Sequence, residues 1–348
     1  MNIIPYLNYE PIVAATCSFN NWVSIIGRTN VGDKCHFGDM VTLRADGHSI
    51  TVGSNCWFGD YSTVHIADSL FGVSLSNNVT ISRFGLAHAC SIDENTILGE
   101  NAVVMDNACV GANSLICADS VVPPGKKLES GWIYQGIPAK PVREISEYEL
   151  DQLRNVIRAP EHNTSSYPII QSQNRVPDIR HEAGLGVKEN NVNGVYIAPT
   201  AIIAGDLTMK NQSSIWFGVE IDANRGYVEI GAESNVQDNS RITLDANETA
   251  KIGKRVTIGH NVRIHSCDIG DNCIIGMGST LGKGTIVRNG GVVAAGAITA
   301  PNTEVLPGMI WSGNPARQSR ALSKENADLF SVGVDVYKTY AKNYNAIQ

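Results

Sequence analysis

The sequence lacks the features of several common protein classes. It has no block of Lys and Arg, and its formal net charge is −7, so we expect no surface for nucleic acids or anionic membranes. No apolar run is long enough to span a bilayer. The N-terminal residues MNIIPYLNYEPIVAA contain no basic leader before their apolar residues, so we expect no secretory signal. We therefore expect a cytoplasmic protein with no nucleic-acid or membrane partner.

The eight cysteines include no CxxC pair. Cys35, Cys56 and Cys273 recur at one fixed place in the repeat described next, where small side chains point inward. We therefore interpret them as small buried hydrophobic residues in a reducing compartment, and not as disulfides or metal ligands.

A six-residue period runs through both halves of the chain. Aliphatic residues recur every six positions at Ile92, Leu98, Val104, Val110, Ile116 and Val122, and again at Ile269, Ile275, Leu281, Val287 and Val293. This period fits neither the 3.6 of a helix nor the 2 of an ordinary strand. It fits a three-sided coil of about 18 residues, in which the aliphatic residue fills the interior and Gly or Asn permits the corner conformation. The sequence therefore predicts an all-β, parallel β-helix.

The length of 348 residues suggests two domains, and the two halves align almost without gaps. Each copy closes with a similar turn, Gly136-Ile137-Pro138-Ala139 or Gly313-Asn314-Pro315-Ala316. Each turn is followed by a predicted helix, and Ser146 with Glu149 forms a capping box for the first. We predict a first β-helix with its C-terminal helix at 1–158, a linker at 159–193, and a second β-helix with its helix at 194–348.

Two smaller features accompany this division. Tyr337, Tyr340 and Tyr344 lie at helical spacing and predict a face that packs on the second prism. Within the polar linker, Tyr167-Pro168-Ile169-Ile170 could add an edge strand.

Histidines are the candidate functional residues, because three imidazoles can hold a catalytic zinc with an open position. His65 and His88 are separated by one coil plus a short loop, so they should lie in neighbouring rungs of one face and converge on one ion. His260 and His265 are about one hexad apart, so they should point from adjacent faces and serve two different sites. The other four, with no partner at useful spacing, are interpreted as ordinary surface or turn residues: His36, His48, His162 and His181.

The histidine segment of the second copy, Val256-Thr257-Ile258-Gly259-His260-Asn261-Val262-Arg263-Ile264-His265-Ser266-Cys267, resembles that of the gamma-class carbonic anhydrases, and so do Gly276-Met277-Gly278 and the Gly313 turn. The resemblance covers nearly all of both copies. It implies left-handed β-helices in a trimer with zinc between subunits, where two histidines come from one subunit and the third from its neighbour.

Carried over to the first copy, the resemblance is incomplete. Arg44 and Asp46 match the family's Arg-x-Asp, and His65 and His88 match the two ligands supplied by one subunit. The position of the ligand donated by the neighbour is Arg83. The family's Asn-x-Gln-Asp segment reads Trp57-Phe58-Gly59-Asp60 and keeps only the Asp.

The second copy has the opposite losses. Its Asn-x-Gln-Asp segment, Asn235-Val236-Gln237-Asp238, is complete, and His260 and His265 are present. Its first ligand position is Thr243, and its Arg-x-Asp has become Asp222 and Asn224.

Only a first copy that faces a second copy assembles three histidines, His65, His88 and His260. We predict that these bind zinc or another divalent metal in a homo-oligomer with sites between domains, although a three-domain ring of two domain types must also contain one contact between like domains.

By resemblance, Gln237 would hydrogen-bond the hydroxide, and Asp60 or Asp238 would orient a ligand imidazole. Arg44 and Asp46 look like the family's interface ion pair, either catalytic or structural. Because Arg83 would repel a cation, its own interface is interpreted as binding an anion or as an ion pair.

The resulting function is hydration of carbon dioxide or a related hydrolysis by zinc hydroxide. Three alternatives remain open at this point. The first is a metal-dependent hydrolase of acyl or thioester substrates. The second is a hexapeptide acyltransferase that uses acyl-CoA. The third is a catalytically inactive assembly protein, in which both copies are degenerate and metal-free.

Overall fold

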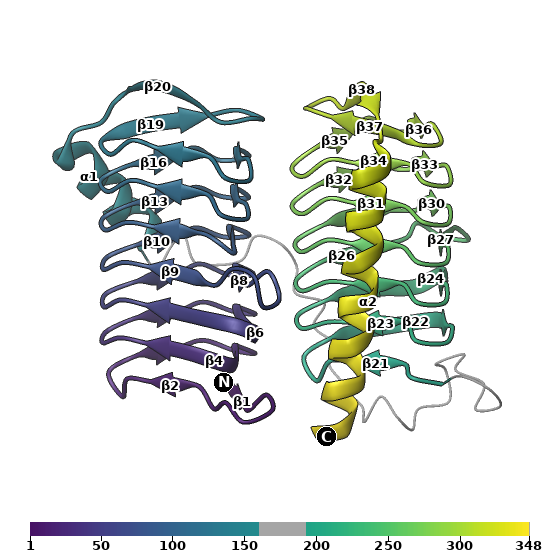
Figure 1. Ribbon diagram of the computed structural model, residues 1–348, viewed down its shortest axis with the longest axis horizontal. Coiled ribbons are helices and arrows are strands. Elements are labelled where there is room, and N and C mark those ends of the chain that lie inside the picture. Colours follow the sequence, from purple (N-terminus) through teal and green to yellow (C-terminus); the bar gives the residue numbers. More distant parts are fainter. Residues whose placement is uncertain (160–192, 348) are drawn as a thin grey trace. The chain divides into compact units, whose positions relative to one another are not determined.

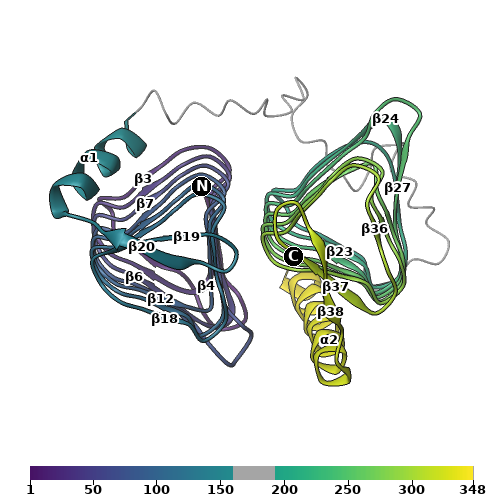
Figure 2. The same ribbon diagram turned by 90° about the horizontal axis from the view of Figure 1, so that it is seen from above.

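The structure is a computed structural model that describes residues 1–159 and 193–347 (Figure 1). Contacts within the chain divide it into two compact units, Met1–Tyr167 and Pro168–Gln348. Each is a parallel β-helix with short strands stacked coil on coil, as the six-residue period predicts (Figure 1). Viewed along its coils, each unit has a three-sided section (Figure 2).

The first unit contains two sheets. Its 12-stranded sheet is formed by β1 (Asn2–Ile4), β2 (Ile12–Val13), β4 (Ser24–Val31), β6 (Thr42–Val52), β8 (Thr63–His65), β9 (Val73–Leu75), β11 (Leu86–His88), β12 (Ser91–Ile92), β14 (Val103–Val104), β15 (Cys109–Val110), β17 (Val121–Val122) and β18 (Lys127–Leu128). Its 8-stranded sheet is formed by β3 (Ser18–Phe19), β5 (His36–Phe37), β7 (Trp57–Phe58), β10 (Thr80–Ile81), β13 (Ile97–Leu98), β16 (Leu115–Ile116), β19 (Trp132–Gln135) and β20 (Lys140–Glu144).

The second unit repeats this plan. Its 8-stranded sheet is formed by β21 (Tyr196–Ile197), β23 (Ser214–Ile215), β25 (Asn235–Val236), β28 (Thr257–Ile258), β31 (Ile274–Ile275), β34 (Val292–Val293), β37 (Met309–Ser312) and β38 (Arg317–Ala321). Its 10-stranded sheet is formed by β22 (Ile202–Met209), β24 (Glu220–Ile230), β26 (Arg241–Thr243), β27 (Thr249–Ile252), β29 (Arg263–His265), β30 (Asp268–Ile269), β32 (Thr280–Leu281), β33 (Ile286–Val287), β35 (Ile298–Thr299) and β36 (Glu304–Val305).

Identical side chains stack in the interior because successive coils are in register. Phe19, Phe37 and Phe58 lie one above another, with ring centroids 5.0 and 4.8 Å apart. The inward cysteines Cys35, Cys56 and Cys273 are buried, as the repeat predicts, and each of the eight cysteines is free.

The corners follow the prediction for Asn but not for every Gly. Asn95, Asn101, Asn107 and Asn113 all have φ between 54 and 60°, the left-handed region that Asn tolerates. The Gly that directly follows an aliphatic residue has another role. A Cβ on Gly99 would lie 2.7 Å from the backbone nitrogen of Ala118 in the next coil, so this position requires glycine for close packing and not for its φ.

A helix follows each prism, as predicted. Helix α1 (Glu147–Ile157) begins at the Ser146–Glu149 capping box, and its Leu150 packs against Ile97 and Ile145. Helix α2 (Lys324–Ile347) runs along the second unit (Figure 1), with Tyr337 and Tyr344 edge-on to Trp216 at 5.1 and 5.5 Å. The tyrosine stripe therefore is a packing face.

The remaining predictions concern the linker and the four histidines that have no partner at useful spacing. Most of the predicted linker 159–193 lies outside the described residues, and so do His162, His181 and the predicted edge strand at 167–170. Of the other two histidines set aside, His36 stacks on Trp57 and His48 accepts the backbone N–H of Ser49.

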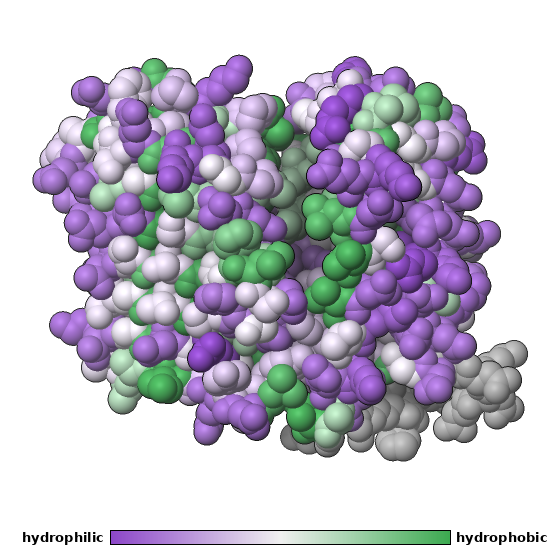
Figure 3. Space-filling view, viewed as in Figure 1, coloured by the Kyte–Doolittle hydropathy of each residue, from purple (hydrophilic) through white to green (hydrophobic). Residues whose placement is uncertain are grey.

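The surface agrees with the polar composition of the turns. Hydrophilic residues cover much of the face shown in Figure 3. In the part of the chain that the structure describes, no helix is both long and apolar enough to cross a membrane.

Candidate functional site

Two histidines of the first unit form a converging pair. Strands β8 and β11 are parallel neighbours, and their register places His88 directly beside His65. His65 Nδ1 lies 3.1 Å from His88 Nε2. Two nitrogen ligands of a tetrahedral zinc, each about 2.0–2.1 Å from the ion, lie about 3.3 Å apart. The spacing of this pair therefore fits two ligands of one zinc ion with little adjustment.

A carboxylate stands behind each of these imidazoles. His65 Nε2 lies 3.2 Å from Asp46 Oδ1, and His88 Nδ1 lies 2.5 Å from Asp106 Oδ1. A carboxylate accepts a hydrogen and cannot donate one when ionised, so each histidine donates its outer N–H. The nitrogens that face each other then carry lone pairs, which is the arrangement of a metal-ligating histidine oriented by a carboxylate.

Asp46 is also paired with Arg44, whose guanidinium contacts its second oxygen. Both side chains are fully buried, with exposures of 0%. Such a buried pair is stable only while both partners are present, because removing one leaves an uncompensated charge. Arg44 therefore compensates the charge of the carboxylate that contacts His65.

The second unit presents one histidine with a similar support. His260 follows β28, in a different sheet from β29, so it lies on a different face from His265, as the spacing predicts. His260 Nδ1 lies 3.1 Å from Asp238 Oδ2, and Asp238 Oδ1 accepts the backbone N–H of Phe217 at 3.0 Å. The Asp238 carboxylate thus lies beside Nδ1, and Nε2 is the nitrogen on the other side of the ring.

A tyrosine of α2 contacts His260. Tyr337 Oη lies 3.4 Å from its Nε2, a contact that the helical spacing of the tyrosines does not reveal. At β25, which pairs with β28, Gln237 Nε2 donates to Asn235 Oδ1 at 3.1 Å, so the predicted amide is held in a fixed orientation.

In the first unit, the corresponding position is an ion pair. Arg83 Nη2 lies 3.0 Å from Glu100 Oε2 in the coil above. Asp60, which matches Asp238, accepts the backbone N–H of Asp39 at 2.8 Å, while its Oδ2 has no hydrogen-bond partner among the described residues. Burial raises the pKa of the Asp60 carboxyl to about 6. Among the described residues, Asp60 contacts no imidazole. The position equivalent to His260 is Arg83, which pairs with Glu100.

We predict that Asp60→Asn stabilises the protein at neutral pH. A carboxyl whose pKa is about 6 when folded, and lower when unfolded, binds more protons in the folded state, so its ionisation lowers stability as pH rises through this window. The free energy of unfolding in urea should rise by about 2 kcal/mol at pH 7.5 and hardly change at pH 3.5. Asp93→Asn, at an exposed carboxyl of the same unit, is the control. Equal stability of Asp60→Asn and wild type at pH 7.5 would contradict the burial argument.

In the described part of the second unit, one member of the converging pair is replaced. Thr243 and His265 are register partners, so threonine occupies the place of His65. His265 Nε2 lies 3.3 Å from Asp245 Oδ1, and Lys283 Nζ contacts Asp245 Oδ2 at 2.5 Å and Glu248 Oε1 at 2.8 Å. The ammonium of Lys283 lowers the pKa values of both carboxyls.

The Arg-x-Asp position of the second unit has also changed its chemistry. The backbone and side-chain amides of Asn224 both donate to Asp222 Oδ1, so these two residues close on each other. This local turn replaces the buried ion pair found in the first unit.

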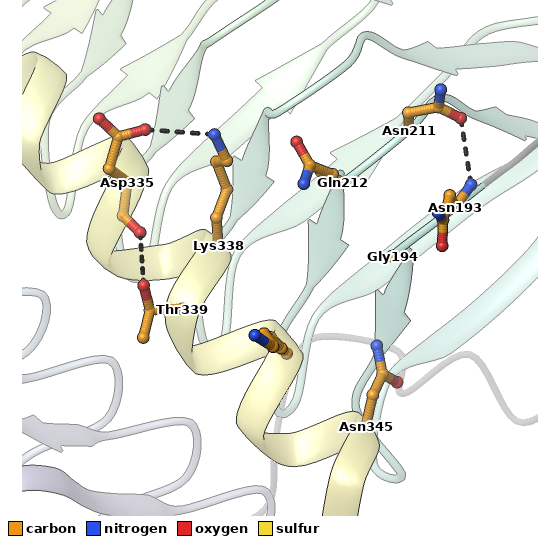
Figure 4. Close-up of a pocket in the computed structure, with 9 residues that line it drawn as sticks. Asn193, Gly194, Asn211, Gln212, Asp335, Lys338, Thr339 and Asn345 are labelled. Atoms are coloured by element: carbon orange, nitrogen blue, oxygen red, sulfur yellow. Dashed lines mark hydrogen bonds and ion pairs between the residues drawn. The ribbon is translucent and has the colours of Figure 1, made fainter.

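An open pocket of about 990 Å³ lies between α2 and the first coils of the second unit (Figure 4). Its lining is polar, and Lys338 is held there by Asp335 at 3.3 Å. The predicted site residues do not line this pocket, which consists of Asn193, Gly194, Asn211, Gln212, Asp335, Lys338, Thr339, Lys342 and Asn345.

Comparison with known proteins defines the class. Residues 249–283 match the family described as bacterial transferase hexapeptide (six repeats). A putative acetyltransferase from Desulfovibrio desulfuricans G20 has a TM-score of 0.58 at 15% identity, covering 94% of this chain and 79% of that chain. At this identity the likeness shows the fold alone, that of a hexapeptide-repeat protein.

Proteins of similar sequence identify a narrower family within the hexapeptide-repeat proteins. The chain is 43% identical over 131 residues to a probable carbonic anhydrase of Methanocaldococcus jannaschii, covering 38% of this chain and 82% of that protein. It is 38% identical over 157 residues to gamma carbonic anhydrase 1, mitochondrial, of Arabidopsis thaliana, covering 43% of this chain and 57% of the relative. For gamma carbonic anhydrase 2, mitochondrial, of the same plant, the identity is 32% over 187 residues, 51% of this chain and 65% of the relative. The chain thus spans about three fifths of the length of these two plant proteins, and it belongs to the gamma carbonic anhydrase-like family of hexapeptide-repeat proteins.

Proposed function

We propose that the chain is a metalloenzyme of the gamma carbonic anhydrase type that hydrates carbon dioxide or performs a related hydrolysis. In this proposal His65 and His88 of a first unit and His260 of a second unit bind zinc or another divalent metal, within one homo-oligomer. The observation that carries the proposal is the complementary state of the two units. The first keeps a converging pair of imidazoles and the second keeps the single supported imidazole.

The charges of Arg83 and Lys283 support the same assignment of metal ligands to the two units. A guanidinium at Arg83 replaces the donated histidine, and an ammonium at Lys283 lies beside the acidic groups near His265. Either cation disfavours a second cation nearby, so we assign no metal to these positions.

Zinc held by three imidazoles lowers the pKa of bound water to about 7 and so supplies hydroxide at neutral pH. The protein's own residues orient the ligands. Asp46 and Asp106 each accept an N–H from one imidazole of the first unit, and Asp238 Oδ2 lies 3.1 Å from His260 Nδ1. Gln237, held by Asn235, is proposed to hydrogen-bond the attacking oxygen.

The test is stopped-flow carbon dioxide hydration with a pH indicator, on protein grown with added zinc. We expect activity that a chelator removes and that zinc restores. Zinc-loaded protein that hydrolyses acyl thioesters but does not hydrate carbon dioxide would support the hydrolase alternative. Protein without zinc or activity would support an assembly role. A cytoplasmic location stays a prediction.

The match of residues 249–283 to a transferase hexapeptide family favours one second candidate, an acyltransferase that uses acyl-CoA. We expect acetyl-CoA to produce no thermal shift, because the proposed site is built for a small molecule at a metal. The control is the same titration with free pantetheine. A clear, saturable shift by acetyl-CoA would contradict the metalloenzyme and favour the transferase.

A further inference from the structure

The position eighteen residues after the second histidine of each unit carries opposite charges. It is Asp106 after His88 and Lys283 after His265. The two positions are equivalent in the fold, because β14 pairs with β11 as β32 pairs with β29, and each residue lies two positions after the end of the upper strand. The family resemblance does not single out this position.

Asp106 acts on the imidazole nitrogen that points away from the pair. Its Oδ1 lies 2.5 Å from His88 Nδ1, so His88 donates its proton there and directs the lone pair of Nε2 toward His65. The carboxylate also increases the basicity of the ligand and adds negative charge close to a bound cation.

Lys283 has the reverse effect in the second unit. Its Nζ contacts one oxygen of Asp245 and one of Glu248, while the other oxygen of Asp245 lies 3.3 Å from His265 Nε2. Together, Asp245, Glu248 and His265 offer ligand atoms within 4.8 Å of one another. The ammonium therefore occupies the carboxylates that a metal ion would need.

We infer that this position decides whether the histidine beside it takes part in metal binding: Asp106 is a positioning residue that makes the His65–His88 pair a ligand pair, and Lys283 is a cation of the protein that keeps His265, Asp245 and Glu248 metal-free. This inference rests on the proposed function. Lys283 remains charged at neutral pH, because the two carboxylates raise the pKa of its ammonium.

The first experiment measures zinc affinity of the full chain by competition with a chromophoric chelator. Asp106→Asn should weaken zinc binding about 10–100-fold, and Asp106→Lys should reduce it further. Asp106→Glu should recover part of the affinity, and Asp93→Asn, an exposed carboxyl of the same unit, should not change it. The visible spectrum of the cobalt-substituted protein provides a second readout: Asp106→Asn should alter it while the thermal melting curve stays unchanged, which a merely structural role would not produce.

The reciprocal experiment builds an acceptor pair in the second unit. Thr243→His combined with Lys283→Asp should raise the zinc content from about one toward about two per chain, with His265 and Asp245 as further ligands. Thr243→His alone, which retains the ammonium, should leave the content at about one. A double variant that stays at one overturns the role of Lys283, and an unchanged affinity in Asp106→Asn overturns the role of Asp106. Wild-type protein that binds no zinc would instead reject the proposed function.

Discussion

Replacing His260 with alanine is expected to remove zinc from the protein as completely as replacing His65. Zinc content should fall from about one ion per chain to below about 0.1 for either variant, because each removes one of three proposed imidazole ligands. The two residues belong to different units, so this equality would not arise if each unit bound metal by itself. Metal analysis after zinc-supplemented growth and extensive dialysis makes the measurement.

His265→Ala is the matched control for this experiment. His265 lies in the same segment as His260 but contacts Asp245 and stands on another face. This variant should retain most of its zinc. Equal zinc content in His65→Ala, His260→Ala and His265→Ala would contradict the assignment of ligands.

Replacing Arg44 with methionine should strongly destabilise the first unit. The change leaves the Asp46 carboxylate buried without its cation, and breaking a buried pair in this way costs about 3–5 kcal/mol. We expect the free energy of unfolding to fall by about this amount. Hydrogen exchange, read peptide by peptide, should show the loss of protection in the first unit and leave the second unchanged.

The control for Arg44 is Arg143→Met, which breaks the ion pair with Glu149. Those side chains are 56% and 41% exposed, so solvent screens their attraction and the change in stability should be small. An equal decrease in the free energy of unfolding for the two substitutions would show that burial does not determine how much the Arg44–Asp46 pair contributes to stability.

Much of the fold could be predicted because one period governs it. A six-residue repeat defines which side chains point inward and which residues are one coil apart. This was enough to place His65 beside His88 and to separate His260 from His265. The glycines after aliphatic residues were interpreted partly wrongly, because close contact between coils depends on backbone atoms that the period does not describe.

The site could be predicted only in part. The repeat predicts which residues are neighbours but not how their side chains turn, so the contact of Asp106 with His88 was missed although the one-coil spacing was visible. Tyr337 was missed because its hydroxyl reaches His260 from a helix whose position on the prism the sequence does not define. Sequence matching identified Arg83 and Asp60 but did not reveal that Arg83 pairs with Glu100 or that Asp60 Oδ2 has no hydrogen-bond partner among the described residues.

These contacts describe a duplicated protein whose two copies have specialised in opposite ways. One copy keeps two oriented imidazoles, and the other keeps one. Each copy also carries a cation near its altered site: Arg83, at the lost histidine position of the first copy, pairs with Glu100, and Lys283, beside His265 in the second copy, pairs with Asp245. In the proposed function, each copy supplies the ligands that the other has lost.

Zinc K-edge absorption spectroscopy of the purified full-length protein, together with His260→Ala, tests this claim most directly. Our account predicts three imidazole nitrogens and one oxygen around zinc in the wild type. A zinc shell that contains only two imidazoles, or that is identical in the variant, would show that unlike halves of this chain do not share one metal ion.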